Sequence, residues 1–216
     1  MNMETFSAKE IFSFGWMKAK KFLVLFCGLF LIIFAVNLLL AFFKNTPSRT
    51  NESMFLIYAL SCFVDLVVGL GLIKVALDIC DDKTPGYAVF FYNFDIFLNY
   101  TVGFILFSLL TTLGILILVI PGIVWFLKFQ FFGYFIVDKK LGPIEALKES
   151  ARITHGIKLR LIKFAILVGF INFLGALVLG IGLIVSIPTT IIAHAALYRK
   201  LASKSIKTGD ASAISS

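Results

Sequence analysis

Long apolar stretches alternate with short polar ones along most of this 216-residue chain. The first, from Phe22 to Phe43, holds 22 residues without a charge, enough for a helix to cross the roughly 30 Å hydrocarbon layer of a bilayer. Comparable stretches follow, and the pattern predicts six transmembrane helices, at about residues 22–43, 54–77, 97–113, 115–137, 160–178 and 181–199. The turns near Gly114 and Gly180 would be tight, so four spanning segments stay an alternative. The predicted fold class is all-α: a polytopic helical membrane protein whose single membrane domain covers residues 1–202.

Amphipathic helical patterns precede the three predicted membrane hairpins. Ser7 and Glu10 have the spacing of a capping box, in which each side chain accepts a hydrogen bond from the other residue's free backbone N–H. Pro143 follows Gly142 and can occupy the first position of a helix, where the backbone N–H that proline lacks would have no partner. Gly156 can end that helix. We expect interfacial helices at about residues 7–17, 85–95 and 143–155. The small, polar segment 203–216 predicts a disordered cytoplasmic tail.

Basic residues gather on one side of the six-helix topology. Of the 20 lysines and arginines, only Lys44 and Arg49 fall on the opposite side, and Lys128 lies within a span. Cytoplasmic flanks carry the excess of basic residues, so both termini are predicted to be cytoplasmic. The net charge is +8, and the lysines and arginines lie beside apolar spans. This placement favours anionic lipids over nucleic acid as the partner of the protein. The candidate lipid head-group contacts are Lys148, Arg152, Lys158 and Arg160.

The stretch from Pro121 to Gly156 resembles the central signature of a large group of uncharacterised bacterial membrane proteins. The matching positions are Pro121-Gly122-Ile123, Val137-Asp138, Gly142, Ala146-Leu147, Ser150, Thr154 and Gly156, with Phe14-Gly15-Trp16 and Tyr198 to Leu201 fitting as well. This group is related to the membrane domain ahead of the phosphodiesterase domain in some glycerophosphoryl diester phosphodiesterases. The resemblance implies a six-helix protein of the bacterial inner or plasma membrane. It carries over no hydrolytic activity, because the 216 residues have no room for the soluble catalytic barrel.

Two charged residues lie within predicted spans and are candidates for an intramembrane function. Asp65 lies near the middle of the second span, where a carboxylate costs roughly 2.5 to 3.5 kcal/mol on insertion scales and therefore needs a partner, a proton or a water path. Lys128 in the fourth span is its most plausible counter-charge, although a lysine side chain can also reach the membrane surface. The alternative to a ligand or proton site is a structural role, in which a neutral or paired Asp65 joins two helices. Asp81 and Asp82 are interpreted as part of a solvated loop.

The sequence lacks the motifs of the common catalytic and cofactor sites. No nucleophile elbow, Walker motif or dinucleotide fingerprint is present, and the two histidines and three cysteines do not have metal-ligand spacing. We therefore expect no catalytic residue, metal or cofactor. The favoured function is a non-enzymatic membrane protein that organises lipids or partner proteins. The alternatives are a small transporter or transporter subunit using Asp65, Lys128 and the span prolines, and a lipid-modifying enzyme; a membrane-protein partner or a homodimer stays open.

Overall fold

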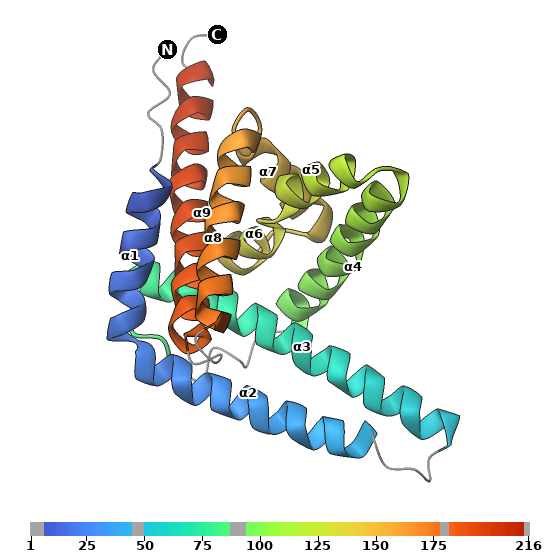
Figure 1. Ribbon diagram of the computed structural model, residues 1–216. Helices are drawn as coiled ribbons and strands as arrows, with labels where there is room; N and C mark the ends of the chain where they lie inside the picture. The colour runs from blue at the N-terminus through green and yellow to red at the C-terminus, as the bar shows by residue number, and fades with distance from the viewer. Residues whose placement is uncertain (1–6, 45–49, 87–93, 178–181, 214–216) are drawn as a thin grey trace.

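The computed structural model describes residues 7–44, 50–86, 94–177 and 182–213, and the regular structure in these ranges is helical (Figure 1). This confirms the all-α prediction. The helices are α1 (Ala8–Lys21), α2 (Leu23–Lys44), α3 (Asn51–Cys80), α4 (Phe94–Ile117), α5 (Val119–Phe129), α6 (Phe132–Lys139), α7 (Pro143–Ile153), α8 (Lys158–Leu177) and α9 (Leu183–Ala213).

Five segments of the described chain are long and apolar enough to cross a membrane, and they overlap the first five predicted spans. They are Leu23–Lys44, Asn51–Cys80, Asp95–Ile117, Val119–Lys139 and Lys158–Leu177. The sixth predicted span, 181–199, falls largely within α9, which is not among them. Polar residues interrupt this part of α9, and Thr189 and Thr190 are buried there among other helices rather than turned towards lipid.

The boundary between the third and fourth spans lies later than predicted. α4 continues to Ile117, and the chain turns at Leu118, which is extended (φ −165°, ψ 141°). Pro121 falls in the first turn of α5, where a backbone N–H has no partner within the helix, so its missing donor is tolerated. The fourth span also differs from a continuous helix, because it divides into α5 and α6.

Helix α9 is the centre of the packing (Figure 1). It contacts α1, α3 and α8, and buries Ile192, Ala193 and Leu197 completely. Gly15 permits the close approach of α1 to α9, since a Cβ there would lie 2.7 Å from the Thr189 carbonyl oxygen. The hairpin of α2 and α3 extends away from α8 and α9, and the C-terminal end of α3 joins the core.

The structure has helices at two of the three predicted surface positions, α1 and α7. Ser7 precedes α1 as its N-cap, but its side chain makes no capping hydrogen bond, so the predicted capping box is wrong. α7 begins at Pro143, as predicted, and Gly156 beyond its end has a φ of +77°, a conformation that suits glycine. The third predicted helix, 85–95, falls mainly on 87–93, outside the described residues.

Helix α9 continues to Ala213 and so includes residues 203–213 of the predicted tail, whereas 214–216 lie outside the described residues. The extension has a simple physical reason. Adding residues to an existing helix avoids the cost of nucleating a new one, and no proline interrupts the segment.

Candidate functional site

The break between α5 and α6 is held together by α7. The Ser150 hydroxyl donates to the Lys128 carbonyl oxygen at 2.9 Å and accepts from the Phe131 backbone N–H at 3.1 Å. The Thr154 hydroxyl lies 3.1 Å from the same carbonyl. These side chains replace hydrogen bonds that a continuous helix would have made. Ser150 and Thr154, two positions of the family resemblance, therefore stabilise an interruption in the fourth span.

A cleft of about 340 Å³ lies beside this break. We call it the aromatic cleft. Four polar side chains reach it, those of Tyr100, Gln130, Tyr134 and His194. Its other lining residues are Gly69, Leu72, Ile73, Phe107, Phe126, Phe132 and Ile191, so α3, α4, α5, α6 and α9 all contribute. Sequence reasoning did not identify this site, because its residues come from five separate helices.

The polar groups of the aromatic cleft are only partly used within the protein. The Gln130 side-chain amide donates to the Leu127 carbonyl at 3.0 Å, and His194 Nδ1 lies 3.2 Å from the Thr190 carbonyl oxygen. Over the described ranges, the hydroxyls of Tyr100 and Tyr134 have no hydrogen-bond partner. The cleft therefore presents several hydrogen-bonding groups in mostly apolar surroundings.

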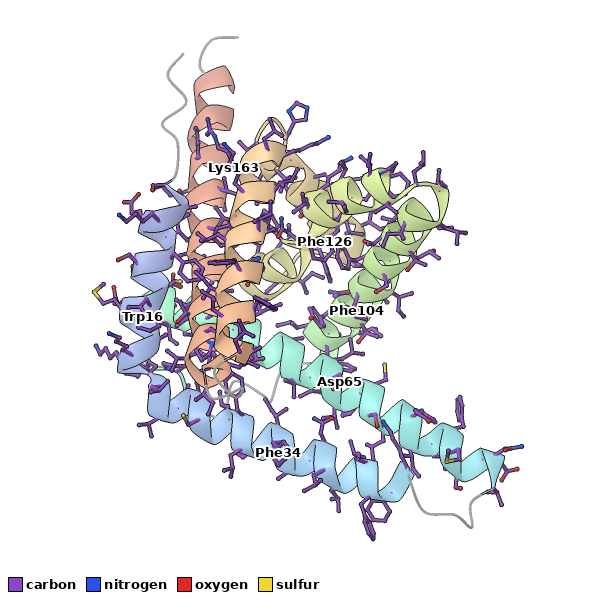
Figure 2. All side chains as sticks on the ribbon, viewed as in Figure 1. Trp16, Phe34, Asp65, Phe104, Phe126 and Lys163 are labelled. Carbon is purple, nitrogen blue, oxygen red and sulfur yellow. The ribbon has the colours of Figure 1, made fainter. Side chains whose placement is uncertain are left out.

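Asp65 and Lys128, the predicted intramembrane pair, are not brought together. Asp65 is exposed on α3 (Figure 2) and makes no hydrogen bond or ion pair with any other described residue. Lys128 lies over the Phe129 ring, with Nζ 5.1 Å from its centroid. The predicted ion pair is wrong because α5 packs mainly against α4, α7 and α8 rather than against α3. Asp65 does lie one helical turn from Gly69 in the cleft wall.

A charged network joins the ends of α3 and α6 to α9. Arg199 donates to Asp138 and to Asp81, both at 2.7 Å, and the Tyr198 hydroxyl donates to Asp138 at 2.9 Å. Tyr198 is fully buried. Asp81 is exposed in the turn after α3, as the solvated-loop interpretation predicted, and its carboxylate also ties α3 to α9.

Asp82, the neighbouring acid, is exposed as predicted but is also paired. It accepts a hydrogen bond from Lys18 of α1. This hydrogen bond holds the pKa of the Asp82 carboxyl below its usual value. The pair links α1 to the end of α3 at the surface.

A second hollow, which we call the α1–α8 groove, has a volume of about 460 Å³. Its lining residues are Lys9, Phe12, Ser13 and Trp16 of α1, with Leu167 and Ile171 of α8. The four α1 residues share one face, because their spacing follows the helical repeat. The groove is therefore apolar along its length and has an ammonium group at one end.

The predicted head-group contacts lie on α7 and at the start of α8. Lys148 and Lys158 are exposed, and Arg160 is half-buried. Arg152 donates to Glu149 through Nε at 3.0 Å and Nη2 at 2.5 Å, which offsets its charge. Arg160 precedes Leu167 of the groove by seven residues, so it shares that face of α8.

The described residues hold no group of three histidine, cysteine or carboxylate side chains suited to a metal ion. The three cysteines are unbonded. The chemistry that the structure offers is therefore hydrogen bonding in the aromatic cleft and charge at the membrane surface.

Comparison with known proteins places this architecture in a family. A family model matches residues 86–207, more than half of the chain. The chain belongs to that family, described as Domain of unknown function (DUF7847). The range matched by DUF7847 holds Asp138 and Arg199 of the network and the four polar residues of the aromatic cleft, whereas Lys9 and Asp65 lie before it.

Curated relatives occur in mycobacteria. The chain is 30% identical to Uncharacterized protein Mb2590 of Mycobacterium bovis and to Uncharacterized protein Rv2560 of Mycobacterium tuberculosis. Each alignment has 172 positions and covers 74% of this chain and 52% of the relative. The chain thus spans about half the length of these relatives. No solved structure matches it significantly.

Proposed function

We propose that this DUF7847 protein is a non-enzymatic protein of the bacterial plasma membrane that binds anionic lipid and organises lipids or partner proteins around it. The observation that carries the proposal is the α1–α8 groove. Phe12, Trp16, Leu167 and Ile171 give it an apolar wall, and Lys9 lies at one end. An acyl chain fits such a wall, and a phosphate head group complements the ammonium.

Charge on α8 extends the basic end of the groove. Lys163 is exposed and lies one turn before Leu167, on the same face of α8 (Figure 2). α1 and α8 run in the same direction past α9, so Lys9 and Lys163 lie towards the same end (Figure 1). The predicted contacts Lys148, Lys158 and Arg160 belong to adjoining segments. The proposed topology keeps α9, which runs antiparallel to α8 (Figure 1), as a sixth crossing. This end then faces the cytoplasm together with both termini.

Native mass spectrometry of the full chain in nanodiscs tests the lipid proposal. The nanodiscs contain phosphatidylcholine with a minor fraction of phosphatidylglycerol, and the measured quantity is the phosphatidylglycerol retained after gentle release. A basic residue near an anionic surface contributes about 1 kcal/mol. The double variant Lys9→Gln with Lys163→Gln should therefore weaken retention by about tenfold or more.

A matched control removes the same charge elsewhere. Lys44→Gln with Lys83→Gln leaves the groove unchanged, and retention should stay close to that of the parent chain. Equal loss in both double variants would show that net charge alone attracts the lipid. Equal retention in the groove variant and the parent chain would refute the groove as the lipid site.

A transporter subunit is the second candidate, and exposed Asp65 favours it. A carboxylate deep in a span needs a partner, and none of the described residues provides one. Binding a cationic side chain of a second membrane protein would supply it. Extraction of the tagged chain in its native lipid, followed by mass spectrometry, should then recover a stoichiometric partner, and Asp65→Asn should release it. We further propose, from the sequence resemblance alone, that the family is related to the membrane domains of glycerophosphoryl diester phosphodiesterases; this relation adds no activity to the chain.

A further inference from the structure

We infer that the aromatic cleft binds a neutral, largely apolar molecule that carries an aromatic ring and a hydroxyl group. This site is separate from the α1–α8 groove and does not depend on the function proposed for it. Ligand pockets range from roughly 300 to 1,000 Å³ and are mostly apolar with a few convergent polar groups. The cleft, at about 340 Å³, belongs to the small end of that range.

The cleft wall favours an aromatic ring. Tyr100 and Phe107 each stack on Phe132, with ring centroids 5.8 Å and 5.2 Å apart and interplanar angles of 18° and 25°. All three residues line the cleft. A planar ligand can extend this series of rings by offset or edge contacts, which add to the gain from burying its apolar surface.

The free hydrogen-bonding groups favour a ligand that donates a hydrogen bond. His194 Nδ1 faces a carbonyl oxygen, which can only accept, so Nδ1 carries the proton and Nε2 of the neutral ring is an acceptor. Gln130 uses its amide N–H towards the Leu127 carbonyl, which leaves its side-chain oxygen as an acceptor. The two tyrosine hydroxyls can donate or accept. A ligand hydroxyl therefore finds partners for both its hydrogen and its lone pairs.

The absence of lining charge selects a neutral ligand. The described residues that line the cleft include no lysine, arginine, aspartate or glutamate. An ion placed among apolar side chains without a counter-charge loses its hydration uncompensated. Packing alone does not explain the hydroxyls of Tyr100 and Tyr134. Phenylalanine would fill the same volume, so the hydroxyls add a hydrogen-bonding capacity that packing does not need. Neither oxygen is among the fully enclosed polar atoms of the described residues, so both are accessible to a bound molecule.

Equilibrium dialysis of 1-naphthol against the full chain in phosphatidylcholine nanodiscs tests the inference, with empty nanodiscs as the background. We expect saturable binding that depends on the protein. 1-Methoxynaphthalene has the same rings but no donor, and should bind at least about threefold more weakly. 1-Naphthoate, which carries a charge, should show no saturable binding.

Two conservative variants locate the bound molecule. Tyr100→Phe and Tyr134→Phe each remove one hydroxyl and should weaken 1-naphthol binding by about threefold to tenfold. Tyr58→Phe is the matched control, because Tyr58 lies on α3 beside Lys44 and away from the cleft. Its binding should equal that of the parent chain.

Three results would overturn the inference. These are no binding above empty nanodiscs, equal affinity for 1-naphthol and 1-methoxynaphthalene, or unchanged 1-naphthol binding in the double variant Tyr100→Phe with Tyr134→Phe. If the tyrosine variants fail to fold, the comparison of the two naphthalene derivatives on the parent chain still decides whether a hydrogen-bonding site exists.

Discussion

Replacing Gly122 with alanine should force α4 and α5 apart. A Cβ at Gly122 would lie 2.3 Å from Cγ1 of Ile115, 2.7 Å from its backbone nitrogen and 2.8 Å from its Cα. Rotation of the Ile115 side chain relieves only the first contact. The 2.7 Å separation must grow to about 3.4 Å, where ordinary van der Waals contact begins. Such overpacking costs about 1–3 kcal/mol, because the backbone of the α4–α5 hairpin has to move.

Thermal unfolding of the full chain in detergent micelles, followed by far-ultraviolet circular dichroism, measures this effect. For a chain of this size, 1 kcal/mol shifts the melting temperature by about 2–4 °C. Gly169→Ala is the matched control, because no heavy atom lies within 4 Å of its added Cβ. In a helix, alanine is favoured over glycine by roughly 0.5–1 kcal/mol. The two variants should therefore shift the melting temperature in opposite directions, and equal or raised stability in Gly122→Ala would refute the close-contact argument.

Three further predictions use the same unfolding assay. Asp138→Asn removes the carboxylate charge that joins α6 to α9 and should lower the stability by about 1–3 kcal/mol. Asp82→Asn at the exposed Lys18 pair should change the melting temperature little. A larger effect of Asp82→Asn than of Asp138→Asn would contradict the network. Ser150→Ala leaves the Phe131 N–H without its acceptor and should cost about 1–3 kcal/mol, which an unchanged melting temperature would exclude. The Lys18 hydrogen bond lowers the pKa of Asp82 from 3.8, so its small stabilisation is present above pH 3.8 and is lost as the pH falls through the lowered pKa. Asp82→Asn should remove this small pH dependence, and an unaltered profile would contradict this.

Hydrophobic pattern alone was sufficient for much of the fold. Phe22 to Phe43 predicts α2 closely, because 22 uncharged apolar residues fit few structures other than a membrane-length helix. The start of α7 was also predictable, since Gly142-Pro143 suits a helix N-terminus. The pattern failed at Ser7, where the sequence has capping-box spacing but the side chain makes no cap bond. Spacing permits such a bond without determining the side-chain rotamer.

The charged network could not be derived from local sequence. Arg199 follows Asp81 by 118 residues and Asp138 by 61, so their contact depends on how α3, α6 and α9 pack. The expected Asp65–Lys128 pair failed for the same reason, because two opposite charges at similar depth need not lie on facing helices. The resemblance did include Asp138 and Tyr198. That was the one signal pointing to the network before the structure placed its members together.

The break in the fourth span was hidden because both sides of it are apolar. Pro121 suggested an interruption inside the span, but the structure places this proline at the start of α5 and the break after Phe129. The hydroxyls of Ser150 and Thr154 stabilise the break from outside the span, so the pattern within residues 115–137 cannot predict it. A helix interruption that depends on a distant hydrogen-bond partner is a tertiary feature and needs the packed structure to be recognised.

The residues of the resemblance mostly explain the scaffold rather than a ligand. Gly122 allows α4 and α5 to approach, Ser150 and Thr154 stabilise the α5–α6 break, and Asp138 fixes α6 to α9. None of these four residues lines the aromatic cleft. The break nevertheless places Gln130 at the cleft, because a continuous helix would direct its side chain differently. The signature can thus preserve the framework of a binding site, while Tyr100, Gln130, Tyr134 and His194 determine what this chain binds.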